Sequence, residues 1–135
     1  MTASFVLDTS ALLAARNGEP GVERVKALLH EAQAGQSRCL VCFMTLMEVY
    51  YRVWKDEGEA AGEAAYHQCL SLPLVWIHET PELLRRAAHV KATHPLSLAD
   101  AWIAATALEH GATLVHKDPE FEKLPGLRQE ILPYK

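Results

Sequence analysis

The sequence predicts a three-layer α/β/α fold with a central parallel sheet of four or five strands. Short runs of almost entirely apolar residues alternate with longer segments of helical period, as expected for strands buried on both faces and crossed by helices. The 135 residues are 50% hydrophobic and 22% charged, which is enough to form a core in one domain spanning residues 1–135. No internal repeat, linker or low-complexity tract interrupts the pattern.

The first half of the chain contains two of the apolar runs. The expected elements are a strand at 5–7, a helix-like segment at 11–15, a helix at 22–33, a strand at 39–44, and helices at 45–57 and 59–70. The 22–33 helix is indicated by Val22, Val25 and Leu28 at helical spacing. Gly35 ends this helix, and Gly58 separates the next two.

The second half continues the alternation of strands and helices. The expected elements are a strand at 74–77, helices at 81–93 and 97–109, a strand at 113–116 and a short fifth strand at 130–132. Pro81 suits a first helical turn, Pro95 separates the two helices, and Gly111 is a good stop after the second.

Four acidic residues fall where a parallel sheet of this kind gathers its loops. Asp8 directly follows the first strand, Asp118 lies just past the fourth, and Glu48 is expected in the first turn of the helix after the second. The helix that carries Asp100 joins the fourth strand through a tight turn, so its first turn starts near the same edge. Ligands bind outside the carboxyl ends of such strands, and we therefore expect the four acids to meet there.

Each acid also has a structural alternative as a helix cap or turn residue. Glu48 would close a capping box with Thr45, and Asp100 would close a similar one with Ser97. Asp118 would cap a helix that begins at Pro119. Asp8 would accept a hydrogen bond from the backbone of its own turn. Capping does not require four acids at one edge, nor Ser10 two residues after Asp8. The two roles are compatible because a helix N-terminus favours a nearby carboxylate.

Clustered carboxylates indicate a site for a hard divalent cation. Like charges at close quarters repel each other and raise each other's pKa, and a bound cation removes that repulsion. Mg²⁺ and Mn²⁺ prefer oxygen ligands, and Mg²⁺ commonly bridges protein carboxylates to substrate phosphate. Such a metal can generate a hydroxide nucleophile or stabilise a leaving oxygen, so phosphodiester cleavage would require no serine or cysteine nucleophile.

The stretches that carry these acids resemble a known family, the PIN domain. The matching segments are Phe5-Val6-Leu7-Asp8-Thr9-Ser10-Ala11-Leu12, Thr45-Leu46-Met47-Glu48-Val49, residues 96–107 around Asp100, and residues 112–121 around Asp118. Their order and spacing agree over nearly the whole chain. The chain looks most like the toxin ribonuclease of a VapBC-type toxin–antitoxin pair.

The resemblance implies a Mg²⁺- or Mn²⁺-dependent ribonuclease. It assigns the catalytic and metal-binding acids to Asp8, Glu48, Asp100 and Asp118, and it matches Ser10 to a small polar residue that steadies the first acid. It also implies an RNA substrate, a cognate antitoxin whose tail lies across the active site, and a homodimer.

Three residues around the last acid complete the comparison with the family pattern. Lys117 fits a basic residue that often precedes this acid, whereas His116 stands where the family commonly has threonine or serine. Glu120 matches a frequent but variable extra acid, for which plain exposure to solvent is at least as good an explanation.

Other classes of function fit the sequence less well or leave the same residues in place. A PIN-fold nuclease outside a toxin–antitoxin system would have the same residues, and a PIN-fold binding module would have lost some of the acids. A small aspartate-dependent phosphatase would require DxDxT, but the third position here is Ser10. A receiver-like signalling domain would give no place to Glu48 or Asp100.

The net charge of −4 counts against a nucleic-acid partner unless several acids bind metal. The basic residues that could line an RNA groove, or simply face solvent, are Arg16, Arg52, Lys55, Lys91 and Lys117. Tyr50, Tyr51 and Trp54 could stack on bases, but their helical spacing favours a core or a dimer interface.

Features of cellular location point to the cytoplasm. The N-terminus has no basic region ahead of an apolar stretch, and no run of 18 apolar residues predicts a membrane span. Cys39, Cys42 and Cys69 are an odd set without a secretory signal, which favours reduced thiols. The Cys39–Cys42 pair lacks two further zinc ligands at suitable spacing and is interpreted as part of a buried strand.

Overall fold

The fold is a five-stranded, fully parallel sheet with helices on both faces, as seen in a computed structural model that describes residues 2–135. The strands are β1 (Ala3–Leu7), β2 (Ser37–Cys42), β3 (Val75–Ile77), β4 (Thr113–His116) and β5 (Gln129–Ile131). They are ordered β3-β2-β1-β4-β5, and every neighbouring pair is parallel. The predicted fold class is confirmed, and the short fifth strand forms.

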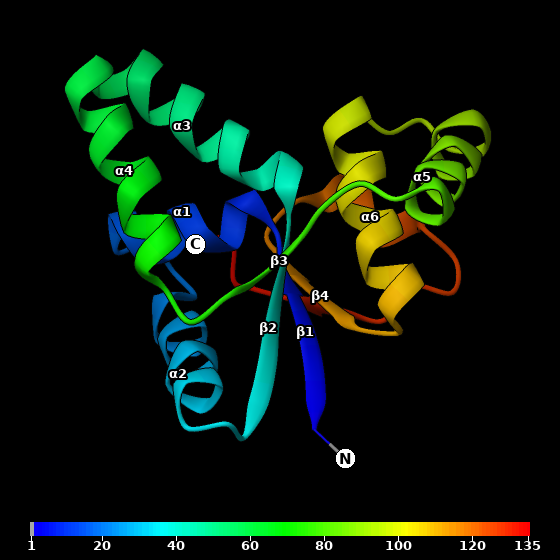
Figure 1. The fold of residues 1–135 in the computed structure, drawn as a ribbon, viewed down its shortest axis with the longest axis horizontal. Coiled ribbons are helices and arrows are strands. Elements are labelled where there is room, and N and C mark those ends of the chain that lie inside the picture. Colours follow the sequence, from blue (N-terminus) through cyan, green and yellow to red (C-terminus); the bar gives the residue numbers. More distant parts are fainter. Residues whose placement is uncertain (1) are drawn as a thin grey trace.

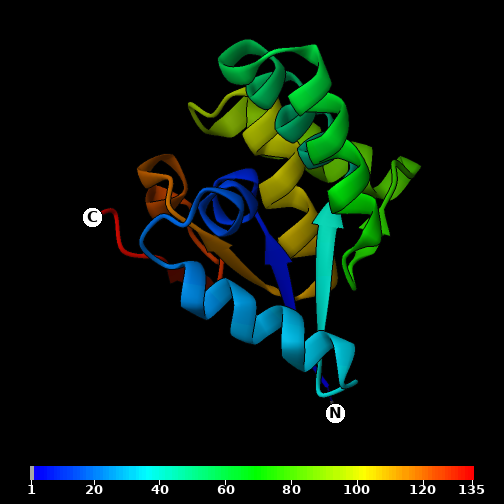
Figure 2. The ribbon, with the colours of Figure 1, turned by 90° about the vertical axis from the view of Figure 1, so that its left-hand side faces the viewer.

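The helices are divided between the two faces of the sheet. They are α1 (Thr9–Asn17), α2 (Val22–Gln33), α3 (Phe43–Glu57), α4 (Glu59–Ser71), α5 (Pro81–Thr93) and α6 (Leu98–His110), with a short 3₁₀ helix, η1 (Pro119–Lys123). Figure 1 shows α1, α2 and α4 on one side of the sheet and α5 and α6 on the other, with α3 rising beyond the ends of the strands. In Figure 2 the arrows of β1 and β2 point the same way, toward α3.

Side chains that alternate along each strand form two cores. Val6, Leu40 and Leu114 belong to the core under α5 and α6, and all are fully buried. The residue after each of them, in β1, β2 and β4 respectively, belongs to the core under α1 to α4. Burial of both faces explains why the strands appear in the sequence as continuous apolar runs.

The boundary between β2 and α3 differs from the sequence prediction. The strand ends at Cys42 and the helix begins at Phe43, so the expected strand at 39–44 was wrong at its carboxyl end. Phe43 packs edge-on against Trp102 of α6, with ring centroids 5.1 Å apart, and this distant contact favours an early helix start. Thr45 is therefore inside the helix and not its cap, and the predicted capping box with Glu48 does not form.

The other predicted caps are present. Asp8 caps α1 by accepting from the Ser10 N–H, Ser97 caps α6 by accepting from the Asp100 N–H, and Asp118 caps η1. The helix after β1 starts at Thr9, two residues earlier than the sequence suggested. Three of the four capping alternatives therefore coexist with the placement of the acids.

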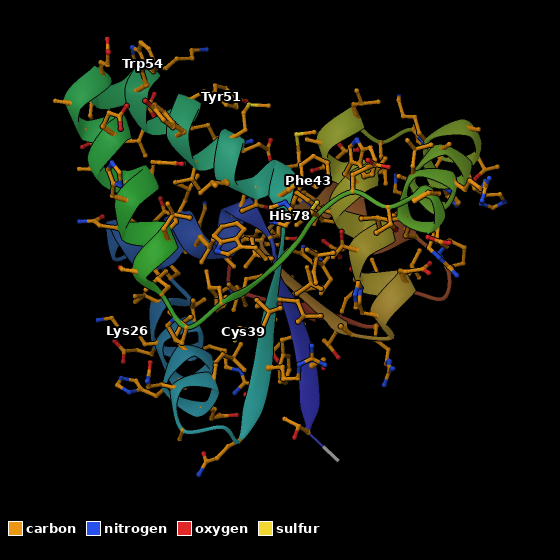
Figure 3. The ribbon with its side chains drawn as sticks, in the orientation of Figure 1. Lys26, Cys39, Phe43, Tyr51, Trp54 and His78 are labelled. Atoms are coloured by element: carbon orange, nitrogen blue, oxygen red, sulfur yellow. The ribbon has the colours of Figure 1, made fainter. Side chains whose placement is uncertain are left out.

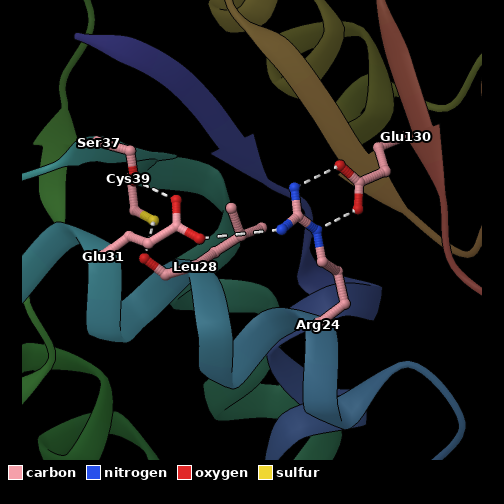
Figure 4. Close-up of polar contacts among 6 residues, drawn as sticks. All are labelled: Arg24, Leu28, Glu31, Ser37, Cys39 and Glu130. Carbon is pink, nitrogen blue, oxygen red and sulfur yellow. Dashed lines mark hydrogen bonds and ion pairs between the residues drawn. The ribbon is translucent and has the colours of Figure 1, made fainter.

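A polar network ties α2 to the sheet edge and to β2 (Figure 4). Arg24 donates two hydrogen bonds to Glu130 in β5, at 2.6 and 3.0 Å, and lies 4.0 Å from Glu31. Glu31 accepts from Ser37 Oγ at 3.4 Å, at the start of β2. The cysteines are free and buried, and Cys39 Sγ lies 3.5 Å from the Leu28 carbonyl, as expected for a thiol inside a strand.

Within residues 2–135 no helix combines the length and the apolar character needed to cross a membrane.

Candidate metal centre

The four acids come from four different elements that end at one edge of the sheet. Asp8 directly follows β1, Asp118 follows β4, Asp100 lies in the first turn of α6, and Glu48 lies in the second turn of α3. The Asp8 N–H donates to the Val115 carbonyl at 3.0 Å, which extends the pairing of β1 with β4 up to the first acid. The charges of the other three carboxylates act on Asp100, so the acids form one electrostatic cluster.

Asp8 is a buried carboxylate held by Ser10. Its side chain is 3% exposed, and Oδ2 accepts from the Ser10 N–H at 3.1 Å and from the Ser10 hydroxyl in a short hydrogen bond. Burial raises the pKa of Asp8, the two bonds from Ser10 oppose this, and the charges of Glu48 and Asp118 raise it further. The Ser10 hydroxyl also accepts from the Lys117 N–H at 3.0 Å, so it joins the loop after β1 to the loop after β4.

Glu48 is also buried, at 7% exposed, and faces α1 and its own helix. Oε1 accepts from the Thr9 hydroxyl at 2.7 Å, and Oε2 lies 3.9 Å from Arg52 one turn later. Thr9 Oγ1 also lies 3.3 Å from Thr45 Oγ1, so Thr9 links α1 to α3 at two side chains. Glu48 is thus oriented by partners from two helices.

Asp100 is affected by the other three acids of the cluster. Burial and the nearby charges of Asp8 and Asp118 raise its pKa to about 7. Asp118 lies in the loop after β4, where Oδ1 accepts from the Glu120 N–H at 3.0 Å. Near neutral pH the cluster therefore holds a proton that a metal cation would displace.

The donor set suits a hard divalent cation. All four side chains offer carboxylate oxygens, the ligands that Mg²⁺ and Mn²⁺ prefer, and their mutual repulsion is the kind that a cation relieves. Among residues 2–135, however, no three His, Cys, Asp or Glu side chains converge closely enough to ligate one ion as they stand. The carboxylates of Asp8, Glu48 and Asp118 instead accept internal hydrogen bonds, so side-chain rotation would accompany metal binding.

A hollow of about 330 Å³ opens beside Ser10 and contains three of the five basic residues named from the sequence. Arg16, Arg52 and Lys117 line it. Arg16 is paired with Glu57 at 2.7 Å, and Lys117 Nζ donates to the Pro20 carbonyl at 3.0 Å, so both are held at the wall. The hollow is also lined by acidic residues, Glu19 and Asp56 among them, so it is a mixed-charge surface.

The remaining basic and aromatic candidates lie elsewhere. Lys55 is exposed, and Lys91 lines a separate hollow between α5 and α6. Tyr50 bonds to Glu63 and packs against Tyr66, with ring centroids 5.3 Å apart, in the contact between α3 and α4. Figure 3 shows Tyr51 and Trp54 on the outer side of α3, where they are 40% and 45% exposed.

The structure also places the three residues around the last acid. Lys117 points its ammonium group toward the loop at residues 19–20, and Glu120 is exposed. His116 is fully buried and accepts from the Asp118 N–H at 3.0 Å through Nδ1.

Sequence reasoning missed two residues that support the acids. Thr9 bonds Glu48, and Gln129 bonds the ring of His116 at 2.8 Å. Thr9 lies between Asp8 and Ser10, so its position in the motif was a usable signal. Gln129 carried no local signal, because its partner lies in a neighbouring strand thirteen residues earlier.

Comparison with known proteins was made for sequence and for structure. A family model described as "PIN domain" matches residues 5–127. No curated protein shows significant similarity in sequence.

Among solved structures the chain is similar to VapBC2 from Rickettsia felis bound to a promoter DNA fragment, with a TM-score of 0.78 and 20% identity over 96% of this chain and 99% of the other. It is also similar to DNA-bound VapBC from Salmonella typhimurium, with a TM-score of 0.76 and 23% identity over 97% and 98% of the two chains. A third is VapC20 of Mycobacterium tuberculosis, a sarcin–ricin loop cleaving toxin, with a TM-score of 0.71 and 21% identity over 96% and 99%. At these identities the likeness is one of fold.

Proposed function

The chain belongs to the PIN-domain family, and from this premise we propose that it is a Mg²⁺- or Mn²⁺-dependent endoribonuclease. The site is formed by Asp8, Glu48, Asp100 and Asp118, within a single PIN domain covering residues 1–135. The observation that carries the proposal is the clustering of four carboxylates at the carboxyl edge of a parallel sheet, where burial and then the charges of the neighbouring acids raise the pKa of Asp100 to about 7.

The roles of the residues follow from their environments. The four acids would hold the cation, and when bound it would lower the pKa of water and stabilise charge on the scissile phosphate. Ser10 orients Asp8 through its hydroxyl, and Thr9 and Arg52 orient Glu48. Arg16, Arg52 and Lys117 line the adjoining hollow, where their positive charge would attract the phosphate backbone of RNA.

The proposal includes a toxin role. Structural neighbours from several bacteria are VapBC toxin–antitoxin complexes. The alignments cover nearly all of this chain and of each neighbouring chain, which supports the same type of protein here. We infer that the chain is the toxin of a type II pair, acts on RNA in the cytoplasm, forms a homodimer and is inhibited by a cognate antitoxin. The alternatives are a PIN-fold nuclease outside such a system and a small aspartate-dependent phosphatase.

The enzymatic proposal is tested with purified protein and a structured RNA. Cleavage is expected with Mg²⁺ or Mn²⁺, is expected to stop in chelator, and is expected to be lost in Asp8→Asn and Asp100→Asn. Glu23→Gln, which removes one charge from the exposed face of α2, is the matched control and should cleave normally. Full cleavage by either Asn variant would disprove the site, and hydrolysis of small phosphate esters with intact RNA would favour the phosphatase.

The biological role requires separate measurements. Growth arrest on induction, relieved by a neighbouring short reading frame, is expected for a toxin, and its absence would favour a solitary nuclease. Sedimentation of the purified protein as a dimer is expected, and a monomer would contradict that part of the proposal.

A further inference from the structure

His116 at the end of β4 is bonded at both ring nitrogens and fully buried. Nδ1 lies 3.0 Å from the Asp118 backbone nitrogen, and Nε2 lies 2.8 Å from Gln129 Oε1 in β5. The ring packs on Phe121, with centroids 5.0 Å apart. Both ring nitrogens are therefore satisfied, as a buried imidazole requires, and one of the two partners is the backbone of Asp118 itself.

The partners of His116 fix its tautomer. The Asp118 N–H can only donate, so Nδ1 accepts. Gln129 donates its amide Nε2–H to the Phe121 carbonyl at 2.9 Å, which turns the Gln129 oxygen toward the ring. His116 Nε2 must then carry the proton and donate it to Gln129.

These bonds act on the loop between β4 and η1, which backbone bonds hold at His116 and at Asp118 through their carbonyls. Between β4 and η1, the Lys117 N–H donates to Ser10 Oγ, the Asp118 N–H to His116, and the Glu120 N–H to Asp118 Oδ1, each at 3.0 Å. The peptide before Asp118 is thus held by a side chain, that of His116, while the Asp118 carbonyl accepts from the Phe121 N–H at 3.2 Å. Gln129 braces the far end of the same loop through the Phe121 carbonyl.

We propose that His116, braced by Gln129, is a positioning residue that fixes Asp118 for metal binding. It acts through the Asp118 peptide and does not touch substrate. This inference rests on the proposed function, because it requires Asp118 to be a metal ligand. The side chain of residue 116 is thereby a determinant of cation affinity, although it is sealed inside the core.

The test compares three substitutions by calorimetric titration of the metal-free protein with Mn²⁺. His116→Phe keeps a ring in the core but leaves the Asp118 N–H without an acceptor, and a loss of affinity of about 10–100-fold is expected, as for other groups that orient metal ligands. His116→Asn supplies an oxygen near the Nδ1 position, which can accept from the N–H two residues later, and should recover most of the affinity. Gln129→Met removes the hydrogen bond to His116 Nε2, and its Mn²⁺ affinity should lie between those of the His116→Phe and His116→Asn variants.

Controls separate this effect from a general loss of stability. Ser37→Ala removes a buried hydroxyl at the opposite end of the sheet and should leave Mn²⁺ affinity unchanged. The RNA KM should change little in the His116 variants while kcat falls, because the binding surface is not altered. If His116→Phe does not fold, the Asn and Met variants still give a result, and ¹⁵N NMR of the wild type should show His116 protonated at Nε2 alone.

The outcomes also distinguish this inference from the proposed function. If Asp118→Asn binds Mn²⁺ as tightly as the wild type, the metal site itself is wrong. If Asp118→Asn weakens binding but His116→Phe and Gln129→Met do not, the site stands and the positioning role is overturned. A ring protonated at Nδ1 would also overturn it, since that nitrogen could not accept from the Asp118 N–H.

Discussion

Burial and mutual repulsion make the ionised form of the clustered acids destabilising for the metal-free protein. Asp100 has a pKa of about 7 in the folded chain against an ordinary value of 3.8, because of burial and then of Asp8 and Asp118. A group whose folded pKa is raised stabilises the fold fully below its unfolded pKa, and this stabilisation is lost as the pH rises through the folded value. Above pH 7 the carboxylate therefore opposes folding unless a cation is present.

Asp100→Asn should stabilise the metal-free protein at pH 8 while it abolishes cleavage. Removing the charge should raise the free energy of unfolding by roughly 1–2 kcal/mol, because solvent partly screens the repulsion at this partly exposed carboxyl. The measurement is thermal unfolding in chelator at pH 8 and pH 5. The gain in Tm over the wild type should be larger at pH 8, and a variant less stable than the wild type at pH 8 would contradict the electrostatic account.

Ser10→Ala should weaken the site without removing an acid. The hydroxyl donates to Asp8 and accepts from the Lys117 N–H, so its loss raises the pKa of Asp8 further and frees the loop that carries Asp118. Mn²⁺ affinity and kcat are each expected to fall about 10–100-fold. Ser10→Thr keeps the hydroxyl and serves as the control, and equal affinities in Ser10→Ala and the wild type would argue against this role.

The sequence allowed prediction of residues whose role is local. Asp8 and Asp118 bond the backbone of their own turns, and such motifs are visible in a few consecutive letters. Glu48 lies one turn later in its helix than the sequence predicts, because α3 begins at Phe43 and not at Thr45. Gln129 was not predicted, since only the pairing of β4 with β5 brings it to His116.

At the scale of elements, the hairpin of α3 and α4 depends on one close approach. Gly62 of α4 is buried against α3, and a Cβ atom there would lie 3.0 Å from the Tyr50 carbonyl oxygen and 3.0 Å from Trp54 Cβ. The far end of α3 is tied to α1 by the pair of Arg16 and Glu57, at 2.7 and 3.2 Å. The helix that carries Glu48 is thus fixed along its length.

Gly62→Ala should destabilise the protein, against the usual helix preference. Alanine normally favours a helix over glycine by about 1 kcal/mol, but the added methyl group must displace the α3 backbone, at a cost of roughly 1–3 kcal/mol. Urea unfolding should give a lower midpoint for this variant.

The exposed Ala64, one half-turn later in α4, provides the comparison. Ala64→Gly should lower stability only by the helix preference of about 1 kcal/mol. A higher urea midpoint for Gly62→Ala than for the wild type would show that the α3–α4 interface accommodates an added methyl group without strain.

Element boundaries show where sequence prediction failed. The start of α3 could not be located, because Phe43 and Met44 are apolar and suit a buried strand equally well. In the structure Phe43 packs on Trp102 of α6, a contact between segments far apart in the chain that no local pattern reveals. The caps of α5 and α6, at Thr80 and Ser97, act within three residues of their partners, and the Ser97 cap was predicted.

For the whole molecule, the strand order explains why the acids meet. From β1 the chain proceeds to β2 and β3 on one side, and then crosses back to β4 and β5 on the other. The loops after β1 and β4 therefore leave the sheet in opposite directions and open a crevice between them, the usual ligand site of such sheets. Asp8 and Asp118 follow these two strands, so the topology itself sets the position of the cluster.

Because the proton on the cluster and the cation compete, metal affinity should depend on pH near neutrality. With a pKa of about 7 for Asp100, deprotonation must precede or accompany binding, and the Mn²⁺ Kd should rise about tenfold from pH 8 to pH 6 if one proton is released. Titration calorimetry at pH 7 in two buffers of different ionisation enthalpy would count that proton.

Asp100→Asn is the matched variant for this prediction, because it cannot take up the proton. Its residual Mn²⁺ binding should be weaker at every pH and should change less between pH 8 and pH 6 than that of the wild type. The buried Asp8, whose pKa is also raised, would account for any dependence that remains in the variant. A wild-type Kd that is constant over this range would show that metal binding displaces no proton between pH 6 and pH 8, which would contradict the raised pKa of Asp100.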